Sequence, residues 1–195
     1  RGVRGMTLVV GLNGSPRRNG NSATLLDQAL GGARGSGAEV IRYDLAFLNI
    51  SPCRACEDCF ANGACVIRDD MDALYDSLER ADAVIVASPI YFSGMSSQTK
   101  IAVDRCQALW ARRKVLESER RPGVGAIILT GAQPNAKFDN AVSELRAFLI
   151  GIGIVPSQVL KVAGADGASY STEHPDVLAR ARDLGTDLVS SISGP

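Results

Sequence analysis

Five short apolar runs, separated by longer amphipathic stretches, constrain the fold of this sequence more than any other feature. Each run is rich in Val, Ile and Leu and shows little alternation between apolar and polar residues. Strands with this pattern are buried on both faces, as the strands of parallel sheets are. We therefore predict strands at Thr7–Asn13, Glu39–Asp44, Ala83–Ser88, Gly123–Thr130 and Ile154–Val162.

The amphipathic stretches predict helices at Asn21–Ala33, Asp70–Arg80, Ser96–Lys114, Asn135–Ile150 and Pro175–Ser191. The alternation of strands and helices predicts an α/β fold with a parallel sheet, right-handed crossovers and helices on both faces. For five strands we expect a flavodoxin-like three-layer sandwich of strand order 2-1-3-4-5, with ligands at the carboxyl ends of the strands. A length of 195 residues suits one domain over residues 1–195.

Composition argues against several partners. The formal net charge is zero and the isoelectric point is near 6.8, whereas nucleic-acid-binding domains carry a basic excess. No segment reaches the roughly 18 apolar residues that span a bilayer, and the first apolar run leads into a loop without a small-residue cleavage site. We expect no nucleic-acid partner, no membrane association and a location in the reducing cytoplasm.

Four cysteines lie in the long connection of residues 45–69. They are Cys53, Cys56, Cys59 and Cys65, with the spacing C-x2-C-x2-C-x5-C. Four thiolates at short spacing can hold an iron–sulfur cluster, and sites of four cysteines also bind zinc. Incidental thiols or a disulfide are the third interpretation. Clustered cysteines in a reducing compartment more often serve metal or redox chemistry, and so long a loop is usually functional.

The loop after the first strand is rich in polar groups and leads into a helix, whose N-terminus is an anion site. A Walker A loop and a G-x-G-x-x-G fingerprint are both absent, although Asp44 lies where a ribose-binding acid would. A mononucleotide phosphate fits better, and a turn that only caps the helix is the alternative. Candidate phosphate ligands are Ser15, Asn19, Asn21 and Ser22, with Arg17 or Arg18 adding charge.

Two further loops follow the third and fourth strands. The first contains Pro89, Ile90, Tyr91, Phe92 and Ser93, and the second contains Thr130, Gly131 and Ala132. The aromatic residues can form a wall against a flat ring, or they can anchor the loop to the core. Glycine in the second loop allows the backbone to approach a ligand closely. A phosphate loop, an aromatic wall and a small-residue wall together predict an FMN site.

These residues give the chain a resemblance to the NADPH-dependent FMN reductase family of flavodoxin-like proteins, and within it to the iron–sulfur flavoproteins. The matching stretches are GSPRRNGNSATLL (Gly14–Leu26), CRACEDCFANGACVIRDDM (Cys53–Met71) and SPIYFSGMSSQTKIAVDR (Ser88–Arg105). The resemblance implies phosphate contacts by Ser15, Arg17, Asn19, Asn21 and Ser22, and ring contacts by Pro89 to Ser93 and by Thr130 to Ala132. It also implies a 4Fe–4S cluster on the four cysteines, and a homodimer or homotetramer.

The same resemblance implies that NAD(P)H delivers hydride to FMN, which passes electrons to a small-molecule acceptor or a redox protein. The alternative is an electron carrier that ferredoxin reduces and that has no nicotinamide site. In both cases the cofactor carries the chemistry, so we predict no catalytic side chain.

Several reactive residues have simpler interpretations. The single histidine, His174, is expected to be a solvated loop residue, and Cys106 a small core residue. Trp110 is expected in the core or at a subunit contact rather than on the flavin. Asp69 and Asp70 suit the start of a helix.

Overall fold

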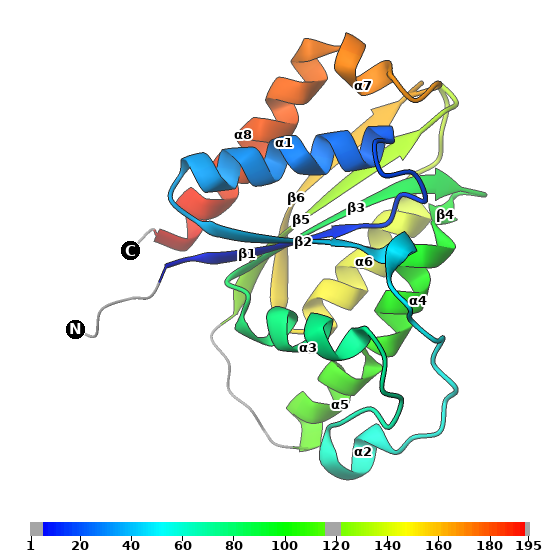
Figure 1. Ribbon diagram of the computed structural model, residues 1–195. Coiled ribbons are helices and arrows are strands. Elements are labelled where there is room, and N and C mark those ends of the chain that lie inside the picture. Colours follow the sequence, from blue (N-terminus) through cyan, green and yellow to red (C-terminus); the bar gives the residue numbers. More distant parts are fainter. Residues whose placement is uncertain (1–5, 116–121, 194–195) are drawn as a thin grey trace.

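The computed structural model describes residues 6–115 and 122–193, which surround one twisted sheet (Figure 1). The five long strands are β1 (Leu8–Asn13), β2 (Glu39–Asp44), β3 (Ala83–Tyr91), β5 (Gly123–Gly131) and β6 (Ile154–Ala163). They lie in the order β2-β1-β3-β5-β6, and all neighbours are parallel. Among the long strands alone this is the order 2-1-3-4-5, so the predicted topology is confirmed. The short β4 (Gly94–Met95) pairs antiparallel with the end of β3.

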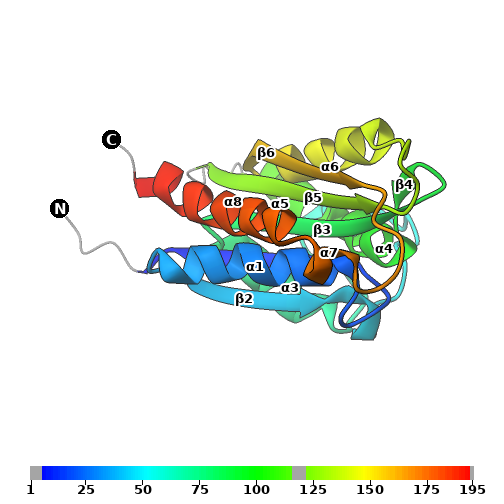
Figure 2. The same ribbon diagram turned by 90° about the horizontal axis from the view of Figure 1, so that it is seen from above.

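Helices cover both faces of the sheet (Figure 2). One face carries α1 (Asn21–Gly35), α7 (Tyr170–Glu173) and α8 (Pro175–Ser193), and the other carries α3 (Met71–Arg80), α4 (Ser97–Arg105), α5 (Gln107–Val115) and α6 (Asp139–Gly151). Successive strand residues feed two apolar clusters, since Val9 belongs to the cluster of α1 and α8 and Val10 to the cluster of α3 to α6. Burial on both faces explains the apolar runs of the central strands β1, β3 and β5, whereas the edge strands β2 and β6 are only partly buried.

The sheet register brings the ends of three strands to one edge. Asn13 at the end of β1 pairs with Ala87 of β3, and Pro89 of β3 pairs with Thr130 of β5. The loops that follow β1, β3 and β5 therefore start side by side, at the carboxyl edge where parallel sheets bind ligands.

The single helix predicted over Ser96–Lys114 is wrong, because the structure divides it into α4 and α5 at Cys106. The N–H of Leu109 donates to the Cys106 carbonyl at 2.9 Å instead of continuing the α-helical pattern. The carbonyl of Arg105 accepts a hydrogen bond from the Tyr75 hydroxyl at 2.8 Å. This hydrogen bond from Tyr75 of α3 satisfies a buried carbonyl at the point where the helix is interrupted.

The helix predicted over Asn135–Ile150 begins only at Asp139. Residues 133–136 form a turn, in which the N–H of Ala136 donates to the Gln133 carbonyl at 3.1 Å. His174, expected to be solvated, is half-buried, and its ring stacks on Tyr170 with a centroid separation of 3.9 Å.

Short elements escaped the sequence analysis because they carry no periodic pattern. They are β4, α7, the 3₁₀ turn Leu45–Phe47 and α2 (Cys59–Asn62), which lies within the cysteine loop. Within the described ranges, no helix is both long enough and apolar enough to cross a membrane.

Candidate functional site

The loop after β1 is folded by its own polar side chains. The side-chain oxygen of Asn13 accepts from the N–H of Ser15 at 3.0 Å. The Ser15 hydroxyl accepts from the N–H of Arg17 at 3.1 Å and donates to the carbonyl of the same residue at 2.9 Å. Ser15 is buried, whereas Arg17 and Asn19 are exposed. The turn thus has a fixed backbone and presents the side chains of Arg17 and Asn19 to solvent.

This loop ends at the N-terminus of α1, which lacks a capping side chain because its N-cap residue is Gly20. The first turn of the helix contains no acidic residue either. The positive end of this 15-residue helix therefore has no acidic side chain of its own first turn against it. Arg18 lies beside it, with its guanidinium carbon 3.8 Å from the ring centroid of Phe47. Such an end is suited to a phosphate group.

Asn21 and Ser22 have partners within the protein. The amide nitrogen of Asn21 donates to the carbonyls of Ala165 and Gly167 at 3.1 and 2.8 Å, and its oxygen accepts from the N–H of Ser171 at 2.9 Å. Asn21 thereby fixes the connection between β6 and α7 against α1. The predicted phosphate contacts of Asn21 and Ser22 stay predictions.

Hydrogen bonds join the loop after β1 and the start of α1 to the carboxyl ends of β3 and β5 and to the N-cap of α4, and we call this region the rim. The N–H of Gly14 donates to the Ala87 carbonyl at 2.8 Å, and the Ser96 hydroxyl donates to the Gly14 carbonyl at 2.6 Å. The hydroxyls of Ser22 and Thr130 lie 2.7 Å apart. Three segments that are distant in sequence, each predicted to hold part of one ligand, are therefore connected directly.

The loop after β3 is a tight hairpin with two aromatic residues at its tip. Tyr91 is 48% exposed and Phe92 is fully exposed, so neither residue anchors the loop to the core. Phe92 and Ser93 have φ angles of +49° and +65°, which non-glycine residues adopt only at a cost. Pro89 and Ile90 are half-buried below them. The hairpin holds its aromatic rings away from the protein, where a ligand or partner can contact them.

The loop after β5 leaves no room for a side chain at Gly131. A Cβ atom there would lie 2.4 Å from the Cβ of Ala136. Thr130 and Gly131 are buried and Ala132 is exposed. Glycine at this position is thus required for packing against Ala136, and the close approach of a ligand to residues 130–132 stays a prediction.

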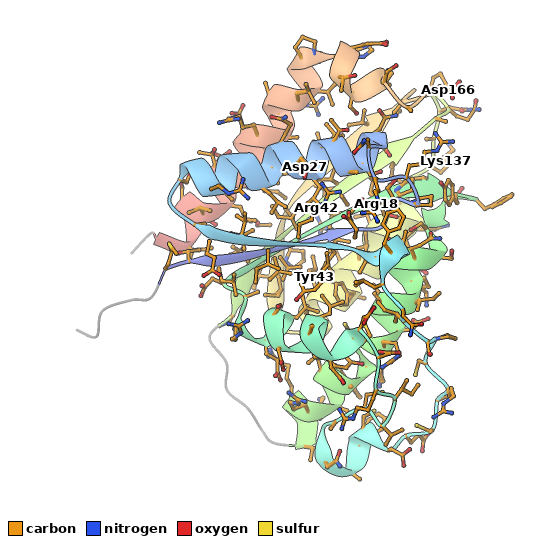
Figure 3. All side chains as sticks on the ribbon, in the orientation of Figure 1. Arg18, Asp27, Arg42, Tyr43, Lys137 and Asp166 are labelled. Atoms are coloured by element: carbon orange, nitrogen blue, oxygen red, sulfur yellow. The ribbon has the colours of Figure 1, made fainter. Side chains whose placement is uncertain are left out.

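Charged residues link β2 to α1 beside this rim, in the region where Figure 3 labels Arg18, Asp27, Arg42 and Tyr43. Arg42 forms ion pairs with Asp27 and Asp44. Burial would raise the pKa of Asp44, but hydrogen bonds from Asn13 and Arg42 outweigh it and hold the pKa below its ordinary value. The carboxylate of Asp44 is therefore ionised and already bound by protein groups.

All four clustered cysteines line one pocket of about 730 Å³, between the cysteine loop, α4, α5 and α6. Their thiols are free. Burial raises the pKa of Cys59, and the nearby charges of Cys65, Cys53 and Cys56 add to the rise. In the described part of the chain, no three His, Cys, Asp or Glu side chains are grouped tightly enough to hold a single metal ion. The pocket gathers four thiols without arranging them around one point.

The backbone of the cysteine loop is strained between the first three cysteines. Ala55 and Glu57 have φ angles of +51° and +64°. Left-handed Glu57 is followed by Asp58 in right-handed conformation, an alternation in which successive N–H groups can converge on an anion. Strain of this kind is concentrated at binding sites.

Two other predictions concern this pocket. Cys106 also lines it and is buried, and burial raises the pKa of its thiol to about 12. This agrees with the prediction of a core residue. Trp110 lies at the pocket and packs edge-on against Phe60 of α2, with ring centroids 5.7 Å apart. Neither residue belongs to the rim.

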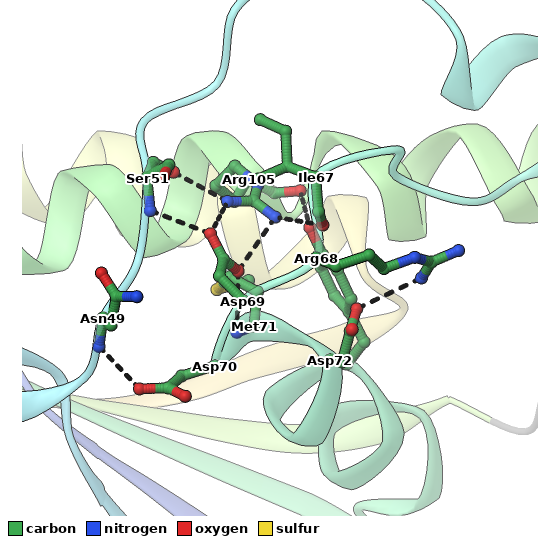
Figure 4. A network of polar contacts seen from close by, with 10 residues as sticks. Asn49, Ser51, Ile67, Arg68, Asp69, Asp70, Met71, Asp72 and Arg105 are labelled. Carbon is green, nitrogen blue, oxygen red and sulfur yellow. Dashed lines mark hydrogen bonds and ion pairs between the residues drawn. The ribbon is translucent and has the colours of Figure 1, made fainter.

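A buried ion pair between Arg105 and Asp69 fastens both ends of the cysteine loop to α4 (Figure 4). The Arg105 terminal nitrogens contact the two Asp69 carboxylate oxygens at 2.6 and 3.2 Å. The same nitrogens donate to the carbonyls of Ser51 and Ile67 at 2.8 and 3.2 Å. Asp69 in turn accepts from the N–H groups of Ser51 and Met71. The side chains of Arg105 and Asp69 are 0% and 4% exposed.

The sequence analysis missed this pair. The prediction that Asp69 and Asp70 start a helix holds only in part, because Asp69 accepts from the N–H of Met71 but mainly serves Arg105. Asp70 accepts from the N–H of Asn49 at 2.6 Å and so also holds the loop. The available signal was the position of Arg105 four residues after Ile101 and three residues after Ala102, on the apolar face of its predicted helix.

The ion pair should make stability depend on pH in the acid range. Burial would raise the pKa of Asp69, but bonds from Arg105, Ser51 and Met71 lower it below its ordinary value. The ionised Asp69 carboxylate therefore stabilises the fold fully above the pKa that it has in the unfolded chain, which is about 4. This stabilisation is lost as the pH falls through the lower pKa that Asp69 has in the folded protein. In urea unfolding, the stability difference between wild type and Asp69→Asn should shrink below about pH 4. A difference that does not change between pH 7 and pH 3 would contradict this.

The sheet order and the ligand loops at its carboxyl edge define a flavodoxin-like protein. The chain belongs to the NADPH-dependent FMN reductase family, a family of oxidoreductases whose model matches residues 7–166. It is 32% identical over 191 residues to an iron–sulfur flavoprotein of Methanocaldococcus jannaschii, covering 94% of this chain and 96% of that protein. The family membership predicted from the sequence is confirmed.

Two further relatives are quinone oxidoreductases. An NAD(P)H dehydrogenase (quinone) of Archaeoglobus fulgidus is 30% identical over 178 residues, with 85% of this chain and 88% of that protein covered. The solved NAD(P)H:quinone oxidoreductase of Methanothermobacter marburgensis superposes with a TM-score of 0.69 at 17% identity, covering 94% of this chain and 98% of that one. At this identity the second similarity supports the fold alone.

Proposed function

We propose that this protein is an FMN-dependent NAD(P)H oxidoreductase that passes electrons from nicotinamide through FMN to a small-molecule or redox-protein acceptor. The observation that carries the proposal is the rim, where hydrogen bonds join the loop after β1 and the uncapped start of α1 to the carboxyl ends of β3 and β5. Family membership and the names of the relatives support it.

The rim residues would hold FMN in two parts. The N-terminus of α1, with Ser15, Arg17 and Asn19, would bind the phosphate, with Asn21 and Ser22 lining the same end. Residues 89–93 and 130–132 would face the ring. When bound, FMN supplies the chemistry, since it accepts a hydride and can release electrons singly or in a pair. The protein's part is to position the ring and to exclude water from it.

We also propose that Cys53, Cys56, Cys59 and Cys65 hold a 4Fe–4S cluster. The donor set fits such a cluster, because four free thiols of one short loop line the same pocket. A cluster spreads its four thiolate bonds over four iron atoms. Several relatives of this chain are named iron–sulfur flavoproteins. The cluster would carry single electrons between FMN and the acceptor.

The proposal extends to the setting of the protein. Residues 1–195 would act as one domain, in a homodimer or homotetramer. The free state of all five cysteines is what supports a reducing, cytoplasmic location.

Anaerobic purification followed by absorption spectroscopy, with flavin, iron and sulfide assays, tests the function. We expect flavin bands above a broad visible shoulder, iron and sulfide in equal amounts, and rapid bleaching of the flavin by NADPH. Bleaching by reduced ferredoxin but not by NADPH or NADH would instead support the electron carrier without a nicotinamide site. A folded protein that stays colourless and does not bind added FMN would refute both functions.

Arg17→Ala should weaken FMN binding, because a charged donor to the phosphate is lost. The expected loss is about 1.5–3 kcal/mol, or roughly 10- to 150-fold in Kd, measured by calorimetric titration of the apoprotein. Arg34→Ala is the matched control, since Arg34 is an exposed arginine in the last turn of α1, the helix that follows the loop of Arg17. Equal affinities in the two variants would exclude Arg17 from the phosphate site.

A further inference from the structure

Arg105 has one donor that the protein does not use. Its two terminal nitrogens serve Asp69, Ser51 and Ile67, as Figure 4 shows. Its Nε is buried and, among the residues that the structure describes, has no hydrogen-bond partner. An unsatisfied buried donor on a charged group is costly and calls for an explanation, such as an absent ion or cofactor.

The spare donor belongs to a residue that lines the cysteine pocket and whose side chain is fully buried behind it. In a guanidinium group the Nε–H points to the same side as Nη2, and here Nη2 donates to the carbonyl of Ile67. The Nε–H therefore points to the side of the guanidinium on which the Ile67 carbonyl lies. Two residues before Ile67 in the chain is Cys65, which lines the same pocket.

The charge of Cys65 also acts on Arg105. Burial alone would lower the pKa of Arg105, but its hydrogen bond to Asp69 raises it, and Tyr75 and the charge of Cys65 add to the rise. Lys100 also lines the pocket, but it is exposed and paired with Asp104. Arg105 is therefore the buried cation of this pocket within the described residues, and the low dielectric strengthens its field.

We propose that Arg105 donates its free Nε–H toward the sulfur atoms of the cluster on Cys53, Cys56, Cys59 and Cys65, and that it thereby raises the cluster's reduction potential. The inference rests on the proposed function and adds a tuning residue to it. A cluster gains negative charge on reduction, so a hydrogen-bond donor to sulfur favours the reduced form, whereas the charge of Arg105 is largely offset by its ion pair with Asp69. Net charge, hydrogen bonds to sulfur and solvent exposure are the properties that set such potentials.

A redox titration of the cluster, followed by electron paramagnetic resonance, tests this assignment without measuring turnover. The main variant is Arg105→Gln combined with Asp69→Asn, which removes the guanidinium without leaving a buried charge. At the wild-type midpoint potential we expect the reduced-to-oxidised ratio to fall about tenfold, equivalent to 59 mV for one electron. Lys100→Gln removes an exposed cation from the same pocket and should leave the ratio nearly unchanged.

Arg105→Lys provides a second measurement if the double variant fails to fold or to hold iron. Lysine keeps the charge beside Asp69 but lacks the Nε–H, so a smaller shift in the same direction is expected. The assignment would be overturned if either variant, loaded with iron, kept the wild-type potential. Arg105 would then only hold the cysteine loop in place. A wild-type protein without iron after anaerobic reconstitution would refute the cluster itself, which is a different failure.

Discussion

Asp69→Ala is expected to lower the free energy of unfolding by about 3–5 kcal/mol, the cost of removing one partner from a buried ion pair. The guanidinium of Arg105 would remain in the interior without its counter-ion, and the N–H groups of Ser51 and Met71 would lose their acceptor. Urea denaturation at pH 7 measures the effect. So large a change would be a substantial fraction of the 5–15 kcal/mol that typically stabilises a folded protein.

Asp104→Ala is the matched control, because it breaks the exposed ion pair with Lys100 on the same helix. Exposed pairs of this kind contribute at most about 1 kcal/mol. If Asp69→Ala were no more damaging than Asp104→Ala, the buried pair would not hold the cysteine loop. The Asp69→Ala variant should also bind FMN normally once folded, since neither Asp69 nor Arg105 belongs to the rim.

Cys56→Ser is expected to abolish bound iron while FMN stays in place. Cys56 lines the pocket with the other three clustered cysteines, whereas the phosphate loop and the two ring loops contribute no described residue to that pocket. Loss of one ligand should therefore affect one cofactor only. Iron, sulfide and flavin assays on the anaerobically purified variant measure all three quantities together.

Cys106→Ala is the control for this variant. Cys106 lines the same pocket, but burial raises the pKa of its thiol to about 12, so it is held as the protonated form, which is a poor ligand. Iron content should be unchanged in Cys106→Ala. Full iron content in Cys56→Ser, or its loss in Cys106→Ala, would contradict the assignment of the four ligands.

The central strands β1, β3 and β5 could be predicted because they are buried on both faces and so leave an apolar pattern, whereas the edge strand β2 is only half-buried. The run Glu39–Asp44 was predicted with the bounds that β2 has. The break at Cys106 could not be predicted, since the apolar pattern continues through it. It depends on the Tyr75 hydroxyl, which comes from another helix and leaves no local signal.

The candidate site, like the fold, could be predicted from the sequence only in part. Residue types and their order indicated which loops would line the rim, and the sheet register brings those loops together. The intramolecular contacts of Asn21 and the burial of Arg105 depend on chain segments far away in sequence. A motif shows that a polar residue matters, but only tertiary structure shows which group it contacts.

Helix α4 connects the two sites physically. Ser96, its N-cap residue, donates to Gly14 at the rim, and Arg105, its last residue, holds the cysteine loop. Its nine residues extend about 14 Å, and one inserted residue would turn Arg105 by about 100° relative to Ser96. Either anchorage would then be lost. The length of α4 thus sets the separation between the rim and the cysteine pocket.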